Sequence, residues 1–127
     1  MDHDAAIVGY GPTGATLANL LALCGLRVLV LDREPAIYPL PRAVHFDEEV
    51  MRVFQTIGIA RDLAPKLRVN PGMRFVEAVT GDLLMDWPRP QEITAQGWHA
   101  SYRFHQPDLE ELLRTRLATQ PCVTVHT

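Results

Sequence analysis

The sequence predicts an α/β fold built on a parallel sheet, and the first 32 residues carry most of the evidence. A short apolar run at residues 5–8 ends abruptly in glycines, and helix-type spacing follows from about Thr13 to Cys24, with Gly25 as a C-terminal stop. A second, β-branched apolar run covers residues 27–31. A helical crossover of this length makes the two strands parallel, with a right-handed connection.

A second helix is predicted in FDEEVMRVFQTIGI, residues 46–59. Asp47 is placed to cap its start, acidic residues occupy the first turn, and Gly58 marks its end. The apolar face carries Val50, Val53, Phe54 and Ile57. Residues 34–44 before it hold three prolines and no periodicity, which is typical of a loop.

A third helix is predicted in PDLEELLRTRLA, residues 107–118, with Pro107 at a favoured first-turn position. Its apolar face carries Leu109, Leu112, Leu113 and Leu117. The strand-like run CVTVHT follows at residues 122–127, and we expect it to be a third parallel strand. Residues 73–87 are expected to form an antiparallel β-hairpin that turns at Thr80-Gly81-Asp82.

Length and composition are those of one globular domain of 127 residues. A net charge of −3 gives no electrostatic footprint for nucleic acid. The apolar runs are shorter than the roughly 20 residues that span a bilayer, and we expect no membrane contact. The start MDHD lacks the pattern of a secretory signal, and Cys24 and Cys122 form no disulfide framework, so the expected location is the cytoplasm.

The glycine motif G-x-G-x-x-G, formed by Gly9, Gly11 and Gly14, predicts a dinucleotide site in a Rossmann-like β-α-β unit. The glycines would serve a tight turn, backbone approach to a pyrophosphate, and close helix–strand packing. The helix N-terminus, which includes Pro12 and Thr13, offers amides and a positive dipole end to phosphates. The alternative is that the glycines only tighten a turn.

Asp32 follows the second strand, 23 positions after the first glycine, where an acid accepts hydrogen bonds from the adenosine ribose. The alternative is that Asp32 only caps a loop. An acid here disfavours the 2′-phosphate of NADP, an effect that the neighbouring Arg33 softens.

Three stretches, residues 5–35, 41–59 and 103–114, together resemble the amino-terminal part of FAD-dependent aromatic-ring hydroxylases, the single-component flavoprotein monooxygenases. The group that acts on 3-(3-hydroxyphenyl)propionate is the most similar. The resemblance implies that residues 1–127 are the amino-terminal part of an FAD-binding domain and that residues 72–87 begin a substrate-domain sheet. It implies that Arg42 lies against FAD and that Gln106 approaches the flavin chain. The alternatives are that Arg42 is exposed to solvent and that Gln106 is an ordinary residue at a helix start. The candidate cofactor-binding residues are Gly9, Gly11, Pro12, Thr13, Gly14, Asp32, Arg33, Arg42 and Gln106.

The resemblance also implies an activity: NAD(P)H reduces FAD, and the reduced flavin uses O₂ to hydroxylate a small phenolic substrate. No catalytic residue can be assigned in this segment, which we expect to be inactive alone and to self-associate through exposed core surface. An NAD-dependent dehydrogenase, a flavin oxidase and a non-catalytic dinucleotide-binding module are the alternatives. The segment PRAVHFDEEVMR argues against the dehydrogenase.

For six residues outside the motif we favour structural roles over cofactor or metal binding. His45 and Asp47 could line the flavin edge, but the preferred interpretation is that they are a loop histidine and a helix cap. His99 and His105 lack metal-ligand spacing, so no metal site is predicted. Cys24 and Cys122 are expected in the core.

Overall fold

The computed structural model describes residues 2–127 and contains the predicted parallel sheet. Its strands are β1 (Ala5–Val8), β2 (Val28–Leu31) and β8 (Val123–His126), in the order β1-β2-β8. Both neighbouring pairs are parallel, with Val28 opposite Ala5 on one side and opposite Val123 on the other. The predicted α/β fold and third parallel strand are therefore confirmed.

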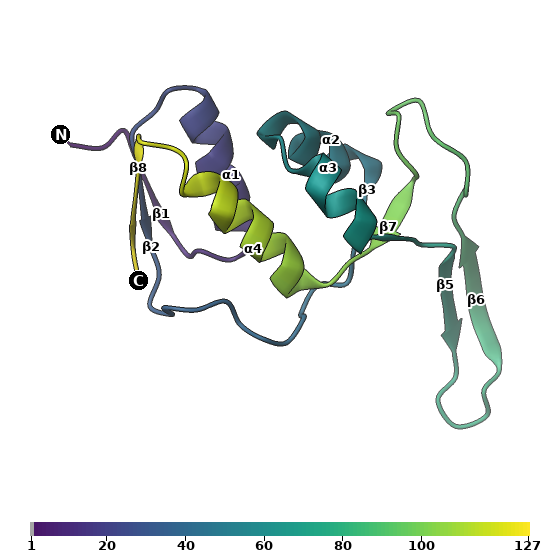
Figure 1. Cartoon of the computed structure of the whole chain (residues 1–127). Helices are drawn as coiled ribbons and strands as arrows, with labels where there is room; N and C mark the ends of the chain where they lie inside the picture. The colour runs from purple at the N-terminus through teal and green to yellow at the C-terminus, as the bar shows by residue number, and fades with distance from the viewer. Residues whose placement is uncertain (1) are drawn as a thin grey trace.

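Two helices, α1 (Pro12–Leu23) and α4 (Gln106–Leu117), lie together on one side of this sheet (Figure 1). The buried strand residues Ile7, Val28 and Val30 pack with these helices in one core. Strand side chains alternate in direction, and Val8 is 87% exposed. Within the described chain, one face of the parallel sheet is therefore covered by helices and the other is bare.

The predicted helical faces agree with the burial found. In α4, Leu109, Leu113 and Leu117 are buried and Leu112 is half-buried. Its start at Gln106 is one residue earlier than predicted. Asn19 of α1 is also buried, and its Nδ2 donates to the Leu113 carbonyl at 3.1 Å, which joins the two helices by a polar contact.

The helix α2 (Glu48–Ile57) begins and ends as predicted. The Asp47 carboxylate accepts a hydrogen bond from the Val50 amide at 3.0 Å, and Gly58 ends the helix in the left-handed region at φ +92°. A short helix, α3 (Ala60–Leu63), and a 3₁₀ turn, η1 (Ala64–Lys66), follow. These two elements were not predicted.

A small antiparallel sheet was also not predicted. It consists of β3 (His45–Asp47), β7 (Ser101–Arg103) and β4 (Arg68–Val69), in the order β3-β7-β4. Two or three residues are too few for an alternating pattern to be recognised. The pairing continues at Phe104, whose amide donates to the Val44 carbonyl at 3.1 Å. This small sheet therefore brings the start of α4 beside the loop that holds Arg42.

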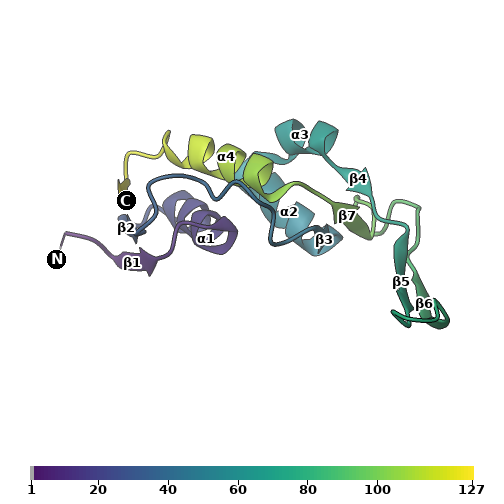
Figure 2. The ribbon, with the colours of Figure 1, turned by 90° about the horizontal axis from the view of Figure 1, so that it is seen from below.

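The predicted hairpin is formed by β5 (Gly72–Val76) and β6 (Leu83–Pro88), which pair antiparallel. It projects away from the helices and the parallel sheet (Figures 1 and 2). Phe75, Leu84, Met85 and Trp87 are exposed on it. None of the helices within residues 2–127 is long and apolar enough to cross a membrane.

We predict that Gly14→Ala destabilises the fold by at least about 2 kcal/mol, because a Cβ at this position would overlap the carbonyl oxygen of Gly9. The carbonyl oxygen belongs to the backbone and cannot rotate aside, so α1 would have to move away from β1. Chemical denaturation followed by circular dichroism measures the change in the free energy of unfolding. Gly11→Ala is the control, because Gly11 has φ −80°, which alanine adopts without strain, and no atom comes within 4 Å of its added Cβ. Equal losses in both variants would contradict the packing role of Gly14.

Candidate dinucleotide-binding site

The three glycines of the motif have different surroundings at the end of β1. Gly9 has φ +112°, a conformation that favours glycine, and its amide donates to the Leu31 carbonyl of β2 at 2.7 Å. Gly14 brings the α1 backbone against the Gly9 carbonyl, where no Cβ fits. Gly11 faces open space, with nothing within 4 Å of the position its Cβ would take. The turn, the helix–strand contact and the open approach are thus assigned to separate glycines.

The N-terminus of α1 presents a cradle that suits a phosphate group. Gly11 is the N-cap and supplies no side-chain cap, Pro12 begins the helix, and the first turn holds no acidic residue. The first amides of a helix have no intrahelical acceptor, and the dipole makes this end positive. A pocket of about 300 Å³ opens here, lined by Ile7, Val8, Gly9, Gly11, Pro12, Thr13, Gly14 and Leu17. The residues present therefore fit a pyrophosphate.

Asp32 lies beside this cradle at the end of β2, and both of its carboxylate oxygens accept backbone hydrogen bonds. Oδ2 accepts from the Tyr10 amide and Oδ1 from the Glu34 amide at 2.9 Å. These bonds hold the pKa of Asp32 below its ordinary value of 3.8. The carboxylate is therefore charged at neutral pH, and its contribution is lost only as the pH falls through that lowered pKa.

The same carboxylate has room for further donors. Each oxygen of an ionised carboxylate can accept two hydrogen bonds, and the side chain of Asp32 is only partly buried. Asp32 can thus hold the Tyr10 loop and accept a ribose hydroxyl together. Arg33 is 91% exposed and pairs with Glu34 at 3.3 Å, so it lies at the rim of the site.

Arg42 lies in the loop between β2 and β3, with an exposed side chain. Its guanidinium carbon is 5.1 Å from the centre of the Tyr38 ring, and no carboxylate within residues 2–127 pairs with it. A planar guanidinium with uncompensated charge suits phosphate oxygens. The stacking on Tyr38, which the sequence gave no reason to expect, keeps the group near its own loop.

Gln106 is almost fully buried at the start of α4, and both ends of its side-chain amide bind protein groups. Its Oε1 accepts from the amides of Arg42 at 2.9 Å and Ala43 at 2.8 Å, and its Nε2 donates to Glu110 Oε1 at 2.8 Å. Gln106 therefore fixes the loop that carries Arg42. Its contact with the flavin chain, implied by the resemblance, stays a prediction.

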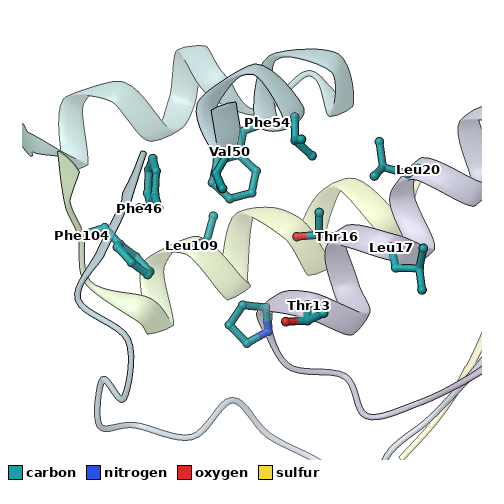
Figure 3. Close-up of a pocket in the computed structure, with 11 residues that line it drawn as sticks. Thr13, Thr16, Leu17, Leu20, Phe46, Val50, Phe54, Phe104 and Leu109 are labelled. Atoms are coloured by element: carbon teal, nitrogen blue, oxygen red, sulfur yellow. The ribbon is translucent and has the colours of Figure 1, made fainter. Parts of the chain in front are cut away.

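A largely apolar pocket between α1 and α2 continues from the glycine loop, and sequence reasoning missed it. Figure 3 shows Thr13, Leu17 and Leu20 of α1 on one side and Phe46, Phe104 and Leu109 on the other. Its full lining is Pro12, Thr13, Thr16, Leu17, Leu20, Phe46, Val50, Val53, Phe54, Phe104 and Leu109. The signal in the sequence was the apolar face of α2, which predicted an amphipathic helix but not a pocket.

The other residues that the sequence singled out either contact protein groups or lie at the surface. Asp47 caps α2, and His45 is exposed on β3. His99 Nδ1 lies 2.7 Å from the Gln91 carbonyl, and His105 Nδ1 lies 3.3 Å from Asp108. Residues 2–127 contain no group of three side chains placed to hold a metal ion. The expectation that both cysteines lie in the core is wrong for Cys24, which is exposed past the end of α1, whereas Cys122 is partly buried.

Comparison with known families identifies the cofactor. The sequence profile of the FAD binding domain matches residues 2–127. The chain belongs to the FAD binding domain family. Membership of an FAD-binding family disfavours the alternative of an NAD-dependent dehydrogenase.

Two curated relatives of the FAD-binding domain are named as hydroxylases of phenolic compounds. A probable NADH-specific resorcinol 4-hydroxylase of Rhodococcus jostii RHA1 is 41% identical over 96% of the chain. A 3-(3-hydroxy-phenyl)propionate/3-hydroxycinnamic acid hydroxylase of Burkholderia cenocepacia HI2424 is 42% identical, also over 96% of the chain. The chain spans 23% and 22% of the length of these two proteins.

A solved structure shows the same fold. The p-nitrophenol 4-monooxygenase PnpA of Pseudomonas putida DLL-E4 superposes with a TM-score of 0.78 at 23% identity, over 96% of this chain and 31% of PnpA. At this identity the likeness concerns the fold. It supports the arrangement of the parallel sheet, helices and antiparallel strands described above.

We predict that Asp32→Ala weakens FAD binding by about 1.5–3 kcal/mol for each charge-assisted hydrogen bond lost to the ribose. Isothermal titration calorimetry measures the change, on a longer protein that carries this chain. Glu34→Ala is the matched control, because the Glu34 side chain is exposed and only its backbone amide meets Asp32. Unchanged affinity in Asp32→Ala would exclude a role for this carboxylate in ribose binding.

We predict that Gly11→Val abolishes most FAD binding but leaves the domain folded. The backbone at Gly11 has φ −80°, which valine adopts readily, and the added side chain enters open space. That space is where a pyrophosphate would lie, so binding suffers and folding does not. Flavin fluorescence titration and thermal unfolding separate the two effects. Normal affinity in Gly11→Val would mean that the glycine loop is structural only.

Proposed function

We propose that this chain is the FAD-binding part of an NAD(P)H-dependent flavoprotein monooxygenase that hydroxylates phenolic compounds. The observation that carries the proposal is the glycine cradle beside Asp32, in a chain over 40% identical to two hydroxylases of phenolic substrates. NADH specificity in the name of one of these relatives supports a nicotinamide reductant. In the proposed reaction, the other two reactants are a phenolic compound and O₂.

The residues of the chain would bind and orient the cofactor. The first amides of α1 donate to the pyrophosphate across the open space at Gly11. Asp32 accepts from the adenosine ribose, and the Arg42 guanidinium donates to phosphate or ribityl oxygens. FAD itself, when bound, supplies electron transfer and oxygen activation. This chain then contributes binding and orientation, and its catalytic residues remain unassigned.

Two further parts of the proposal concern surfaces. Residues 1–127 would form the amino-terminal part of the FAD-binding domain, and the hairpin at residues 72–87 would begin a sheet that contacts substrate. The apolar side chains exposed on β5 and β6, among them Phe75, Met85 and Trp87, support this assignment. Exposed apolar patches of this kind mark surfaces that pack against another segment or bind a ligand. The bare face of the parallel sheet, including Val8, supports self-association of the chain alone.

The proposal predicts different behaviour for the 127-residue chain and for a protein as long as its relatives. The longer protein should bind FAD tightly and consume NAD(P)H and O₂ when given resorcinol or 3-(3-hydroxyphenyl)propionate. The chain alone should bind FAD weakly and form no product, because the ADP half of the site lies at residues 9–32 while little of the chain could enclose the flavin ring. Flavin absorbance and chromatography of the product measure these outcomes.

Three results would contradict the proposal. Hydroxylated product from the 127-residue chain with added FAD and NADH would show that the active site is complete within it. A longer protein that binds FAD but oxidises none of the phenols would favour a flavin oxidase of other specificity. Tight nucleotide binding without any NAD(P)H oxidation would favour a non-catalytic dinucleotide-binding module.

A further inference from the structure

A row of polar side chains along α4 connects the two loops of the proposed FAD site. Gln106, Glu110 and Arg114 are spaced four residues apart and therefore share one face of the helix. Glu110 is only 2% exposed, and its carboxylate accepts from Gln106 at 2.8 Å and lies 3.6 Å from Arg114. Neither Glu110 nor Arg114 belongs to the sequence motif.

The two ends of this row hold different loops. At the first end, Gln106 accepts from the backbone amides of Arg42 and Ala43. At the other end, Arg114 Nη2 donates to the Tyr10 carbonyl at 2.8 Å, and its guanidinium carbon lies 4.1 Å from the centre of the Tyr10 ring. Tyr10 stands between Gly9 and Gly11, and its amide in turn donates to Asp32. The row therefore ends on the glycine loop.

We propose that Glu110 and Arg114 are positioning residues for FAD, which couple the glycine loop to the Arg42 loop through α4. The inference rests on the proposed function of these loops as the FAD site. Glu110 is the shared acceptor of the row, since it binds Gln106 with one carboxylate oxygen and faces Arg114 with the other. A buried carboxylate with both neighbours in place fixes their side chains, and its removal leaves Arg114 with an unpaired charge.

The chain offers closely matched controls on the same helix. Glu111 follows Glu110 but is exposed. Arg116 resembles Arg114 because it also donates to a carbonyl, that of Ile57 at 3.0 Å, but Ile57 ends α2 and lies outside both loops. Arg114→Lys and Arg116→Lys each lose a guanidinium-to-carbonyl bond. Arg114→Lys also alters the contacts with Glu110 and the Tyr10 ring, so the melting temperature of each variant is measured first and FAD is titrated well below both values.

The first experiment measures FAD affinity by flavin fluorescence, well below the melting temperature, in a longer protein that carries this chain. Glu110→Ala and Arg114→Lys should each raise the Kd about tenfold, the effect of one charged hydrogen bond. Glu111→Ala and Arg116→Lys should stay within about twofold of the unsubstituted protein. An equal rise in Arg114→Lys and Arg116→Lys, or no rise in Glu110→Ala, would overturn the proposal.

The second experiment tests the coupling without FAD. Amide hydrogen exchange should accelerate at Arg42, Ala43 and Tyr10 in Glu110→Ala, although Glu110 itself touches none of these amides. Glu111→Ala should leave these three amides protected. Unchanged protection in Glu110→Ala would overturn the coupling. If the unsubstituted protein binds no FAD, the proposed function fails, whereas the exchange result still decides whether α4 connects the loops.

Discussion

The close approach of α1 to the end of β1 is the constraint on which the rest of the structure depends. Because Gly14 has no side chain, the helix backbone rests on the Gly9 carbonyl. This contact sets the position of α1, against which α4 packs, with Asn19 donating to the Leu113 carbonyl. It also places the Tyr10 amide at the end of β2, where the carboxylate of Asp32 accepts it. One contact between backbone segments thus locates both helices of the core and the acid of the site.

The site combines two opposite electrostatic demands within a short stretch of chain. Phosphates need positive potential, which the start of α1 provides without any acidic side chain in its first turn. In the proposed site, the ribose hydroxyls would need an acceptor, which Asp32 at the end of β2 could supply. Two backbone amides donate to the Asp32 carboxylate and stabilise its charged form, so the acid stays ionised at neutral pH. The β-α-β geometry keeps the two groups adjacent and separately oriented.

The parts of the structure that the sequence predicted are those governed by neighbouring residues. The β1-α1-β2 unit follows from glycine spacing and apolar periodicity, and α2 follows from the cap at Asp47 and the stop at Gly58. The parallel position of β8 follows from chirality once α4 precedes it. Each of these inferences uses residues that lie close together in the sequence.

The parts that were missed depend on distant pairings. The antiparallel sheet joins residues 45–47 to residues 101–103. The three residues of either strand contain no pattern that would predict which distant strand they pair with. The role of Gln106 was likewise hidden, because its partners are backbone amides 64 and 63 positions away, and backbone carries no sequence signal. The stacking of Arg42 on Tyr38 and the apolar pocket beside α1 arise only once these elements meet.

The regular spacing along α4 has a consequence for how the length of this domain can vary in evolution. Gln106, Glu110 and Arg114 follow one another at about 6 Å along the helix axis. The separation of the Arg42 loop from the Tyr10 loop is therefore set by two turns of helix, and not by the chain that joins them. A single residue inserted between Gln106 and Arg114 would turn one contact about 100° away from the other, so that stretch of α4 must keep its length.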